Sequence, residues 1–248
     1  MISRDELVEL KSKRNISLYY LEKEYLQYIF LNALSKYGDS ITFKGGTCLR
    51  LCYGLQRASE DLDFSSKLNI EKIKEIVESC LKDFDLLGIE HLDLKQKEFE
   101  GNIRFEIRFK GPLFRSNINS ANNLKIDFNK NKVFNTKAIV ISSVFSDIPI
   151  FVIIAMAEKE ILAEKIRAIA NRKQARDLYD LWILINKNVE IDKELINKKL
   201  KEEKVDLKKI KIISKESYES DLRNLINYIP PYEQVKKDIL DFLGKIIG

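Results

Sequence analysis

The sequence predicts an α/β protein of the α+β kind, in which a mixed sheet comes first and a helical region follows. Over roughly the first 150 residues, segments whose apolar and polar residues alternate are interspersed with stretches whose apolar residues recur at helical spacing. After Pro149 and one further apolar run, almost every apolar pattern has the helical spacing. We therefore expect a first domain over residues 1–155 and a helical second domain over residues 156–248.

Each expected element follows from its own residue pattern. In the first domain, helical spacing predicts helices at residues 16–36, 47–53 and 70–86. Alternating or short apolar runs predict strands at residues 41–43, 61–65, 89–99, 103–109, 124–128, 139–144 and 150–154. The second domain has helical spacing at residues 157–172, 175–186, 192–203, 217–228 and 232–247. Because several β segments are neighbours in the chain, we expect a largely antiparallel or mixed sheet.

The composition excludes several classes of protein. A hydrophobic content of 45% is enough for a folded core, so general disorder is excluded. One histidine and three cysteines cannot supply a multi-histidine or four-cysteine zinc site. The formal net charge of +5 permits nucleic-acid binding without requiring it. The longest apolar stretch, residues 148–157, is about half the length of a membrane helix, so we expect a cytoplasmic protein that does not enter a membrane.

The densest chemical information lies in residues 43–65, FKGGTCLRLCYGLQRASEDLDFS. A short strand runs into Gly45 and Gly46, which open the next helix. Two adjacent glycines let backbone N–H groups approach a phosphate closely, and the N-terminus of a helix favours negative charge. A lone glycine pair is usually only a turn, but the acidic strand that follows gives this one more weight.

That acidic strand carries two carboxylates on one face. Side chains repeat every two residues along a strand, so Asp61 and Asp63 project together while Leu62 and Phe64 point into the core. Two adjacent carboxylates repel each other unless a cation lies between them or one is protonated. A bare D-x-D would more often face water on an ordinary strand, but the preceding strand–glycine–helix unit favours a Mg²⁺ site.

These residues resemble the nucleotidyltransferase superfamily related to DNA polymerase β, whose signature is a helix-opening glycine pair followed by a D-x-D strand. More narrowly, K-G-G-T-x-L-R and R-x-S-E-D-L-D-F-S are similar to motifs of the AbiEii/AbiGii-type toxin family, the toxin half of abortive-infection toxin–antitoxin pairs. A second block supports the resemblance, with E-K-I-R-A at residues 164–168, Arg172, and R-D-L-Y-D-L-W at residues 176–182. The resemblance spans residues 40–185 and implies a polymerase β-like nucleotidyltransferase core.

The second block also has an interpretation from its residues alone. Lys165 is a compact cation at the centre of an expected helix, and it is suited to contact a triphosphate. Asp177 and Asp180 are three residues apart on the next helix, so both carboxylates point one way. Salt bridges that orient the two helices are the alternative. The resemblance implies that Lys165 binds nucleotide phosphates and that Asp177 supports the site, while Asp180 fits either role.

The resemblance also implies a third carboxylate, because polymerase β-like sites use three acids. Asp127 is the main candidate, since it stands among apolar strand residues that would bury it unless it met a cation. A solvent-facing Asp127 is the alternative. Glu106 is the rival, although Arg104, Glu106 and Arg108 share one strand face and could form an ion-pair ladder.

The function implied is that of a Mg²⁺-dependent nucleotidyltransferase toxin that transfers a nucleotide from an NTP to an acceptor hydroxyl, with a cognate antitoxin encoded nearby. Some family members modify the 3′ end of tRNA, so tRNA is the preferred acceptor. Protein nucleotidylation by the same fold and a non-catalytic RNA- or partner-binding module are the alternatives. The helical domain is expected to complete the active-site cleft.

The expected catalytic residues are Asp61, Asp63, Asp127, Lys165 and Asp177, of which Asp61, Asp63 and Asp127 hold metal. The expected nucleotide-binding residues are Lys44, Gly45, Gly46, Ser59 and Lys165.

Three other features have simpler explanations. Cys48 and Cys52 fall on the expected core side of their helix and are interpreted as buried reduced thiols. His91 lies in the β region, where a surface or capping role is expected. The lysine-rich segment at residues 187–211 also carries acids, so it is interpreted as a solvated helical hairpin, with an RNA surface as the alternative.

Overall fold

The computed structural model describes residues 1–14, 16–204, 206–207, 210 and 212–247. The chain divides into two compact units. The sheet unit consists of residues 1–52 and 58–156, and the helical unit consists of residues 53–57 and 157–248. The short segment 53–57 therefore packs with the helices, although the residues on both sides of it belong to the sheet unit.

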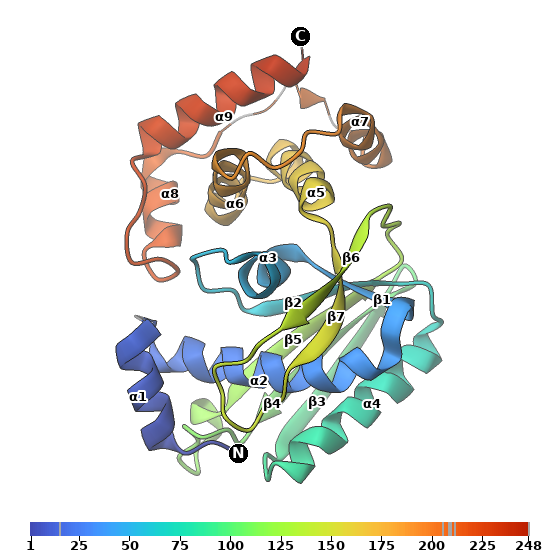
Figure 1. Cartoon of the computed structure of the whole chain (residues 1–248), viewed down its shortest axis with the longest axis vertical. Helices are drawn as coiled ribbons and strands as arrows, with labels where there is room; N and C mark the ends of the chain where they lie inside the picture. The colour runs from blue at the N-terminus through green and yellow to red at the C-terminus, as the bar shows by residue number, and fades with distance from the viewer. Residues whose placement is uncertain (15, 205, 208–209, 211, 248) are drawn as a thin grey trace. The chain divides into compact units, whose positions relative to one another are not determined.

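A mixed seven-stranded sheet forms the centre of the sheet unit (Figure 1). Its strands are β1 (Ile41–Lys44), β2 (Asp61–Ser66), β3 (His91–Phe99), β4 (Asn102–Phe109), β5 (Asn122–Asn129), β6 (Thr136–Ile141) and β7 (Phe151–Met156). They lie in the order β3-β4-β5-β2-β1-β7-β6. The pairs β1–β7 and β2–β5 are parallel and the other pairs are antiparallel, which confirms the predicted mixed sheet.

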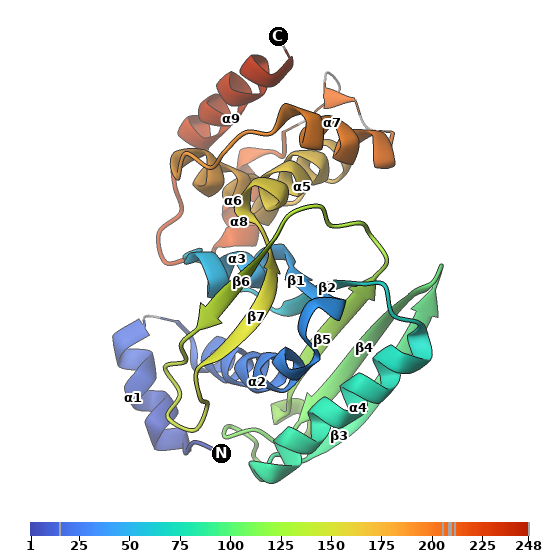
Figure 2. The ribbon, with the colours of Figure 1, turned by 45° about the vertical axis from the view of Figure 1, so that its right-hand side comes forward.

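Four α-helices belong to or begin in the sheet unit: α1 (Arg4–Arg14), α2 (Leu18–Leu34), α3 (Gly45–Tyr53) and α4 (Ile70–Leu86). Short 3₁₀ turns, η1 (Ser35–Ser40) and η2 (Ile118–Ser120), join some of these elements. Helices α2 and α4 pack against each other, and both lie on the same side of the sheet (Figure 2). Helix α1 was not predicted, because it is charged almost all round and buries little besides Leu7.

The two faces of the sheet differ because side chains alternate along each strand. On one face, Phe64 of β2 and Phe128 of β5 are buried and stack with ring centroids 5.0 Å apart. On the same face, Phe109 of β4 stacks on Phe84 of α4 at 4.4 Å, so this is the face that the helices cover. The opposite face of β2, β4 and β5 carries the polar residues of these strands. The acidic residues of the predicted site are therefore held on the polar face by apolar neighbours that anchor the strands.

The helical unit contains α5 (Glu158–Asn171), α6 (Ala175–Asn186), α7 (Lys193–Glu202), α8 (Lys215–Leu222) and α9 (Tyr232–Ile247). Helix α5 packs on α6 and α7, and α6 also packs on α8 and α9. Helix α8 begins earlier than predicted because Ser214 caps it, and it ends at Leu222 rather than at residue 228. Among the described residues, no helix has the length and apolar character needed to cross a membrane.

Candidate active site

The first part of the candidate site is the start of α3, directly after β1. Gly45 has a φ of +80°, a left-handed backbone conformation that glycine adopts without steric cost. A Cβ at this position would collide with Oδ2 of Asp63 and would lie 3.1 Å from its Cβ. Glycine is therefore required for the start of α3 and the Asp63 carboxylate to lie against each other.

The segment that leads into β2 is fixed by hydrogen bonds from α2 and α3. Thr47 Oγ1 donates to the carbonyl oxygen of Asp61 and lies 2.9 Å from Oγ of Ser59. From α2, the buried Gln27 donates its amide to the carbonyl oxygens of Ser59 and Glu60, both at 3.0 Å. Ser59 is thereby held beside the first turn of α3, as a phosphate-binding role would require. Sequence reasoning missed Gln27, because only the fold brings α2 to this segment.

The predicted carboxylates lie on one face of two adjacent strands. Asp63 of β2 is the cross-strand partner of Asp127 of β5, and Asp61 lies two residues earlier on the same face as Asp63. On the other side of β2, Asp63 is the partner of Lys44 of β1, whose Nζ donates to Oδ1 of Asn129 at 3.1 Å. The sequence assigned Asp61, Asp63, Asp127 and Lys44 to one site, and the sheet register aligns them on one face.

Asp127 has an ion-pair partner in this structure. Arg104 Nε lies 2.8 Å from Oδ1 of Asp127, and 52% of the Arg104 side chain is exposed. The rival candidate, Glu106, is one row away, where it accepts a hydrogen bond from Asn123 at 3.3 Å. Within the described part of the chain, no group of three or more His, Cys, Asp or Glu side chains is arranged to hold a metal ion. A three-carboxylate cluster would therefore require Asp127 to exchange Arg104 for a cation.

The residues at this position nevertheless fit a hard divalent cation. Asp61 and Asp63 supply carboxylate oxygens, which are the ligands that such cations prefer. The glycine at position 45 lets the start of α3 lie directly against Oδ2 of Asp63. The polar face therefore has the donor atoms that a cation would need, beside a helix N-terminus that suits phosphates.

The helical unit holds a second group of charged residues, centred on Lys165. Its Nζ lies 2.8 Å from Oδ1 of Asp177 and 2.6 Å from Oδ2 of Asp180, so two of its three N–H donors are directed at carboxylates. Arg57 Nε and Nη2 donate to the two oxygens of Asp180 at 2.6 and 2.7 Å. Arg172 Nε lies 2.7 Å from Oδ2 of Asp177. Three cations thus surround two anions, and the ion pairs expected by the salt-bridge interpretation are present.

The two carboxyl groups of this network are ionised. Burial alone would raise the pKa of Asp177, but Lys165 and Arg172 outweigh it and hold that pKa well below its usual range. Burial opposes ionisation of Asp180 in the same way, and Lys165 and Arg57 lower the pKa of Asp180 below its usual value. The contacts above therefore place three cations around two buried carboxylates, and Arg172, with 51% of its side chain exposed, is the cation that reaches solvent.

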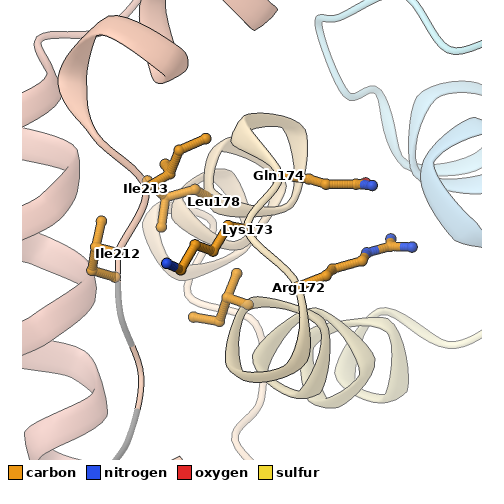
Figure 3. Close-up of a pocket in the computed structure, with 7 residues that line it drawn as sticks. Arg172, Lys173, Gln174, Leu178, Ile212 and Ile213 are labelled. Atoms are coloured by element: carbon orange, nitrogen blue, oxygen red, sulfur yellow. The ribbon is translucent and has the colours of Figure 1, made fainter.

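Sequence reasoning did not assign a role to Arg57 or to Arg172. Arg57 lies four residues before Asp61 in the R-x-S-E-D block, and a buried arginine requires a partner, but the pattern alone does not identify Asp180. In the turn between α5 and α6, Arg172 and Gln174 point to one side while Lys173 points to the other, beside a small pocket whose wall includes Leu178 and Ile213 (Figure 3). This turn brings Arg172 to Asp177.

The lysine-rich segment, the cysteines and His91 lie in different environments. Lys199 is fully buried, and its Nζ lies 2.9 Å from Glu160 and 3.2 Å from Glu164, so this lysine of the 187–211 segment is not part of an exposed surface. Lys208, Lys209 and Lys211 lie outside the described residues. Cys48 is buried, and burial raises the pKa of its thiol, whereas Cys52 is only half-buried. His91 is exposed at the start of β3, as a surface role predicts.

The fold is that of nucleotidyltransferase toxins. It matches the nucleotidyltransferase toxin MenT4 (Rv2826c) of Mycobacterium tuberculosis H37Rv with a TM-score of 0.71 and 17% sequence identity, over 100% of this chain and 90% of that chain. It also matches JHP933 of Helicobacter pylori with a TM-score of 0.62 and 22% identity, over 93% of each chain. A comparison of the sequence with curated proteins found no match.

The sequence itself identifies the family. The family model described as the nucleotidyl transferase AbiEii toxin of type IV toxin–antitoxin systems matches residues 29–246. The chain therefore belongs to the AbiEii family and is a nucleotidyltransferase, as the motifs predicted. Membership implies an NTP substrate and an antitoxin partner, and enzymes of this kind generally use a divalent metal.

Proposed function

We propose that this toxin transfers a nucleotide from an NTP to the 3′ end of tRNA in a Mg²⁺-dependent reaction, at a site built on Asp61, Asp63 and Asp127. The observation that carries the proposal is the alignment of these three carboxylates on one polar face, with the start of α3 against Asp63. The tRNA acceptor rests on the resemblance to family members that modify the 3′ end of tRNA.

The residues around the start of α3 are suited to bind the phosphates of the NTP. Gly45 and Gly46 offer backbone N–H groups at a helix N-terminus, where the helix dipole favours negative charge. Ser59 is held beside them by Thr47 and can donate its hydroxyl. Lys44 adds a positive charge at the end of β1. These groups would hold the triphosphate in place while the acceptor approaches.

The carboxylates would act on the acceptor side and on the metal. Asp127 would take the proton of the acceptor 3′-hydroxyl as that oxygen attacks the α-phosphate, and pyrophosphate would leave. A Mg²⁺ ion held by Asp61, Asp63 and Asp127 would stabilise negative charge on the attacking and leaving oxygens. For Asp127 to do this, its carboxylate must be released from Arg104.

Lys165 is proposed to neutralise charge on the NTP phosphates. Its ammonium has one N–H donor beyond the two directed at Asp177 and Asp180. The network around it has three cations for two anions, so an anionic ligand would balance its charge. Asp177 would then act as a positioning residue, which holds Lys165 without touching the nucleotide.

The test is to incubate the protein with each NTP, labelled at the α-phosphate, together with total RNA or with nuclease-treated lysate. We expect label in RNA of tRNA size with one or more NTPs, dependent on Mg²⁺ and absent with Asp63→Asn. Label only in protein would replace the tRNA proposal by protein nucleotidylation. If no NTP gave label in either fraction, the chain would be a binding module and the transfer proposal would be wrong.

A further inference from the structure

The polar face of the sheet continues beyond the carboxylates onto β3 and β4, which lie side by side with β5 (Figure 2). Asp127 is the cross-strand partner of Arg104, and Arg104 is in turn the partner of Lys97. One row along, Lys125 is the partner of Glu106, which is the partner of Lys95. The cross-strand register therefore forms two continuous rows of side chains that run from the D-x-D strand to the β3 edge.

These rows are rich in exposed positive charge. We call this the β3–β5 face, and its cations are Lys95, Lys97, Arg104, Arg108 and Lys125. The site carboxylates lie on β2 and β5, whereas the outer strands β3 and β4 carry four of these cations on this face and only two acids, Asp93 and Glu106. Lys95 and Lys97 are exposed and make no ion pair within the described part of the chain. Unpaired, exposed cations on the outer strands of this face attract a polyanion.

Two lysines in the lysine-rich segment of the helical unit already have partners within that unit. Lys199 is fully buried between Glu160 and Glu164. Lys187 lies 2.6 Å from Oε1 of Glu158 and also donates to the carbonyl oxygen of Tyr53. Both lysines form ion pairs within the helical unit, whereas Lys95 and Lys97 make none within the described residues.

We infer that the β3–β5 face binds the backbone of the acceptor RNA and leads its 3′ end to Asp127. This inference rests on the proposed function, in which RNA is the acceptor. Neighbouring strands lie about 4.8 Å apart, so the cations of β4 and β3 lie roughly 10 and 14 Å from β2. RNA bound on this face delivers its terminal hydroxyl to the carboxylates while its preceding phosphates contact the lysines and arginines.

Arg104 links the surface to the site. Its guanidinium is half-exposed and pairs with Asp127, so an RNA phosphate and Asp127 compete for the same cation. When the phosphate takes Arg104, the Asp127 carboxylate becomes available to the metal and to the acceptor hydroxyl. Binding of the acceptor and completion of the carboxylate site are thereby coupled through one side chain.

The test measures binding of fluorescein-labelled unfractionated tRNA to the full-length protein by anisotropy, without NTP and over a range of KCl concentrations. The test variant carries Lys95→Gln, Lys97→Gln and Arg108→Gln. The matched control carries Lys72→Gln, Lys74→Gln and Lys82→Gln on α4, which packs on the opposite face of the sheet. Both variants lose three positive charges, so an effect of net charge alone would be equal in the two.

We expect the test variant to lose about 10-fold or more in tRNA affinity. The slope of log K against log salt should fall by about 2–3, because each lost phosphate contact removes about 0.7–0.9. The control should change the slope by less than about 1. Binding of NTP alone and the thermal midpoint should be the same in both variants. An equal loss of tRNA affinity in the two variants, or no loss in the test variant, would overturn the assignment of this face.

Failure of this inference can be separated from failure of the proposed function. If wild-type protein labels tRNA but the test variant binds tRNA as tightly as wild type does, only the surface assignment is wrong. If wild-type protein labels protein and not RNA, the proposed acceptor is wrong and the surface assignment is wrong with it. Label in tRNA together with a selective affinity loss in the test variant supports both.

Discussion

The two charged clusters of this toxin differ in their access to water. In the sheet unit, Arg104 and Asp127 form a pair in which 52% of the arginine side chain and 15% of the aspartate side chain are exposed. In the helical unit, Arg57 and Asp180 form a pair whose exposed fractions are 2% and 0%. Both pairs have short contacts, at 2.8 and 2.6 Å, so distance alone does not distinguish them.

The difference in exposure indicates different roles. A half-exposed ion pair contributes little to folding, and water or a ligand can replace either partner. A buried pair cannot lose one partner without leaving an unmatched charge in a poorly solvated place. The exposed pair of the sheet cluster can therefore exchange partners, as the proposed binding of metal and acceptor requires. The network around Lys165 has to stay assembled, and it offers only its excess positive charge to a ligand.

The largest expected effect is on catalysis by the sheet cluster. Asp63→Asn should lower nucleotide transfer by at least about 10³-fold, because a carboxylate proposed to hold the metal is lost. The free energy of unfolding should stay the same or rise slightly, since repulsion between Asp61 and Asp63 is relieved without metal. Turnover of each labelled NTP and thermal unfolding would be measured. Asp93→Asn, on β3 of the same face, is the control and should keep its activity; near-normal turnover of Asp63→Asn would exclude the assignment.

A second large effect should follow from Gly45→Ala. An alanine here adopts a left-handed φ, which costs about 1 kcal/mol, and its Cβ also collides with the Asp63 carboxylate. Gly88→Ala is the matched control, because Gly88 has a φ of +71° and nothing lies within 4 Å of the added Cβ. We expect Gly88→Ala to lose only the cost of the left-handed φ, and Gly45→Ala to lose more stability and about 10²-fold or more in transfer. Equal activity of the two variants would show that the close contact between α3 and the Asp63 carboxylate is not needed for transfer.

In the helical unit, the comparison is between Asp180→Asn and Lys165→Met. Asp180→Asn leaves Arg57 and Lys165 buried with one fewer anion and should cost about 3–5 kcal/mol. Lys165→Met leaves two matched pairs, Arg57–Asp180 and Arg172–Asp177, so its cost in stability should be smaller. If Lys165 contacts phosphates, Lys165→Met should nevertheless weaken NTP binding and turnover by about 10–1,000-fold.

The readout for stability is the fluorescence of Trp182 during urea unfolding. Trp182 is the only tryptophan, and it lies on α6, where its Nε1 donates to Asp238 at 2.9 Å. A loss of stability in Lys165→Met as large as that in Asp180→Asn, with normal NTP binding, would reduce Lys165 to a structural salt-bridge partner.

Much of the fold could be predicted from the sequence, because local patterns report burial directly. The alternation in β2, β4 and β5 and the helical spacing in α4 and α6 each mark one buried face. Helix α1 was missed because it has almost no apolar face, and the end of α8 was misplaced because no stop signal follows Leu222 directly. The strand order could not be predicted, since it depends on contacts between segments far apart in the chain.

The candidate site was predictable where its residues share a strand or a motif. Asp61 and Asp63 follow from the two-residue period, and Gly45 follows from its place between a strand and a helix. The Arg104–Asp127 pair and the Arg57–Asp180 pair join residues 23 and 123 positions apart, so only the fold reveals them. Sequence patterns therefore identify candidate catalytic and binding residues, but they do not show which of these charged residues form ion pairs with each other.

A smaller effect is expected from the acid sensitivity of the network around Lys165. The pKa values of Asp177 and Asp180 are lowered in the folded state, so their contribution to stability is fully present above the unfolded-state pKa of about 3.9. It is lost as the pH falls through the folded-state pKa, because the unfolded chain then binds more protons. The stability difference between wild type and Asp180→Asn, followed by Trp182, should therefore be constant from pH 7 to about pH 4 and shrink as the pH falls below that. Asp241→Asn, an exposed carboxylate of α9, is the control and should track wild type; a difference independent of pH would contradict the assignment.

The smallest expected effect on stability is that of Arg104→Gln. Because the Arg104–Asp127 pair is half-exposed, its removal should cost about 0–1 kcal/mol, whereas Arg57→Gln should cost about 3 kcal/mol or more by leaving Asp180 with fewer cations. The free energies of unfolding of the two variants, measured in urea at low and high salt, test the comparison directly. The cost of Arg104→Gln should fall further at high salt, since exposed charges are screened, while that of Arg57→Gln should change little. If Arg104→Gln destabilised the protein as much as Arg57→Gln did, the sheet pair would be a fixed structural contact. Asp127 would then not be free to exchange Arg104 for metal, and the third carboxylate would have to be sought elsewhere on the face, with Glu106 the first candidate.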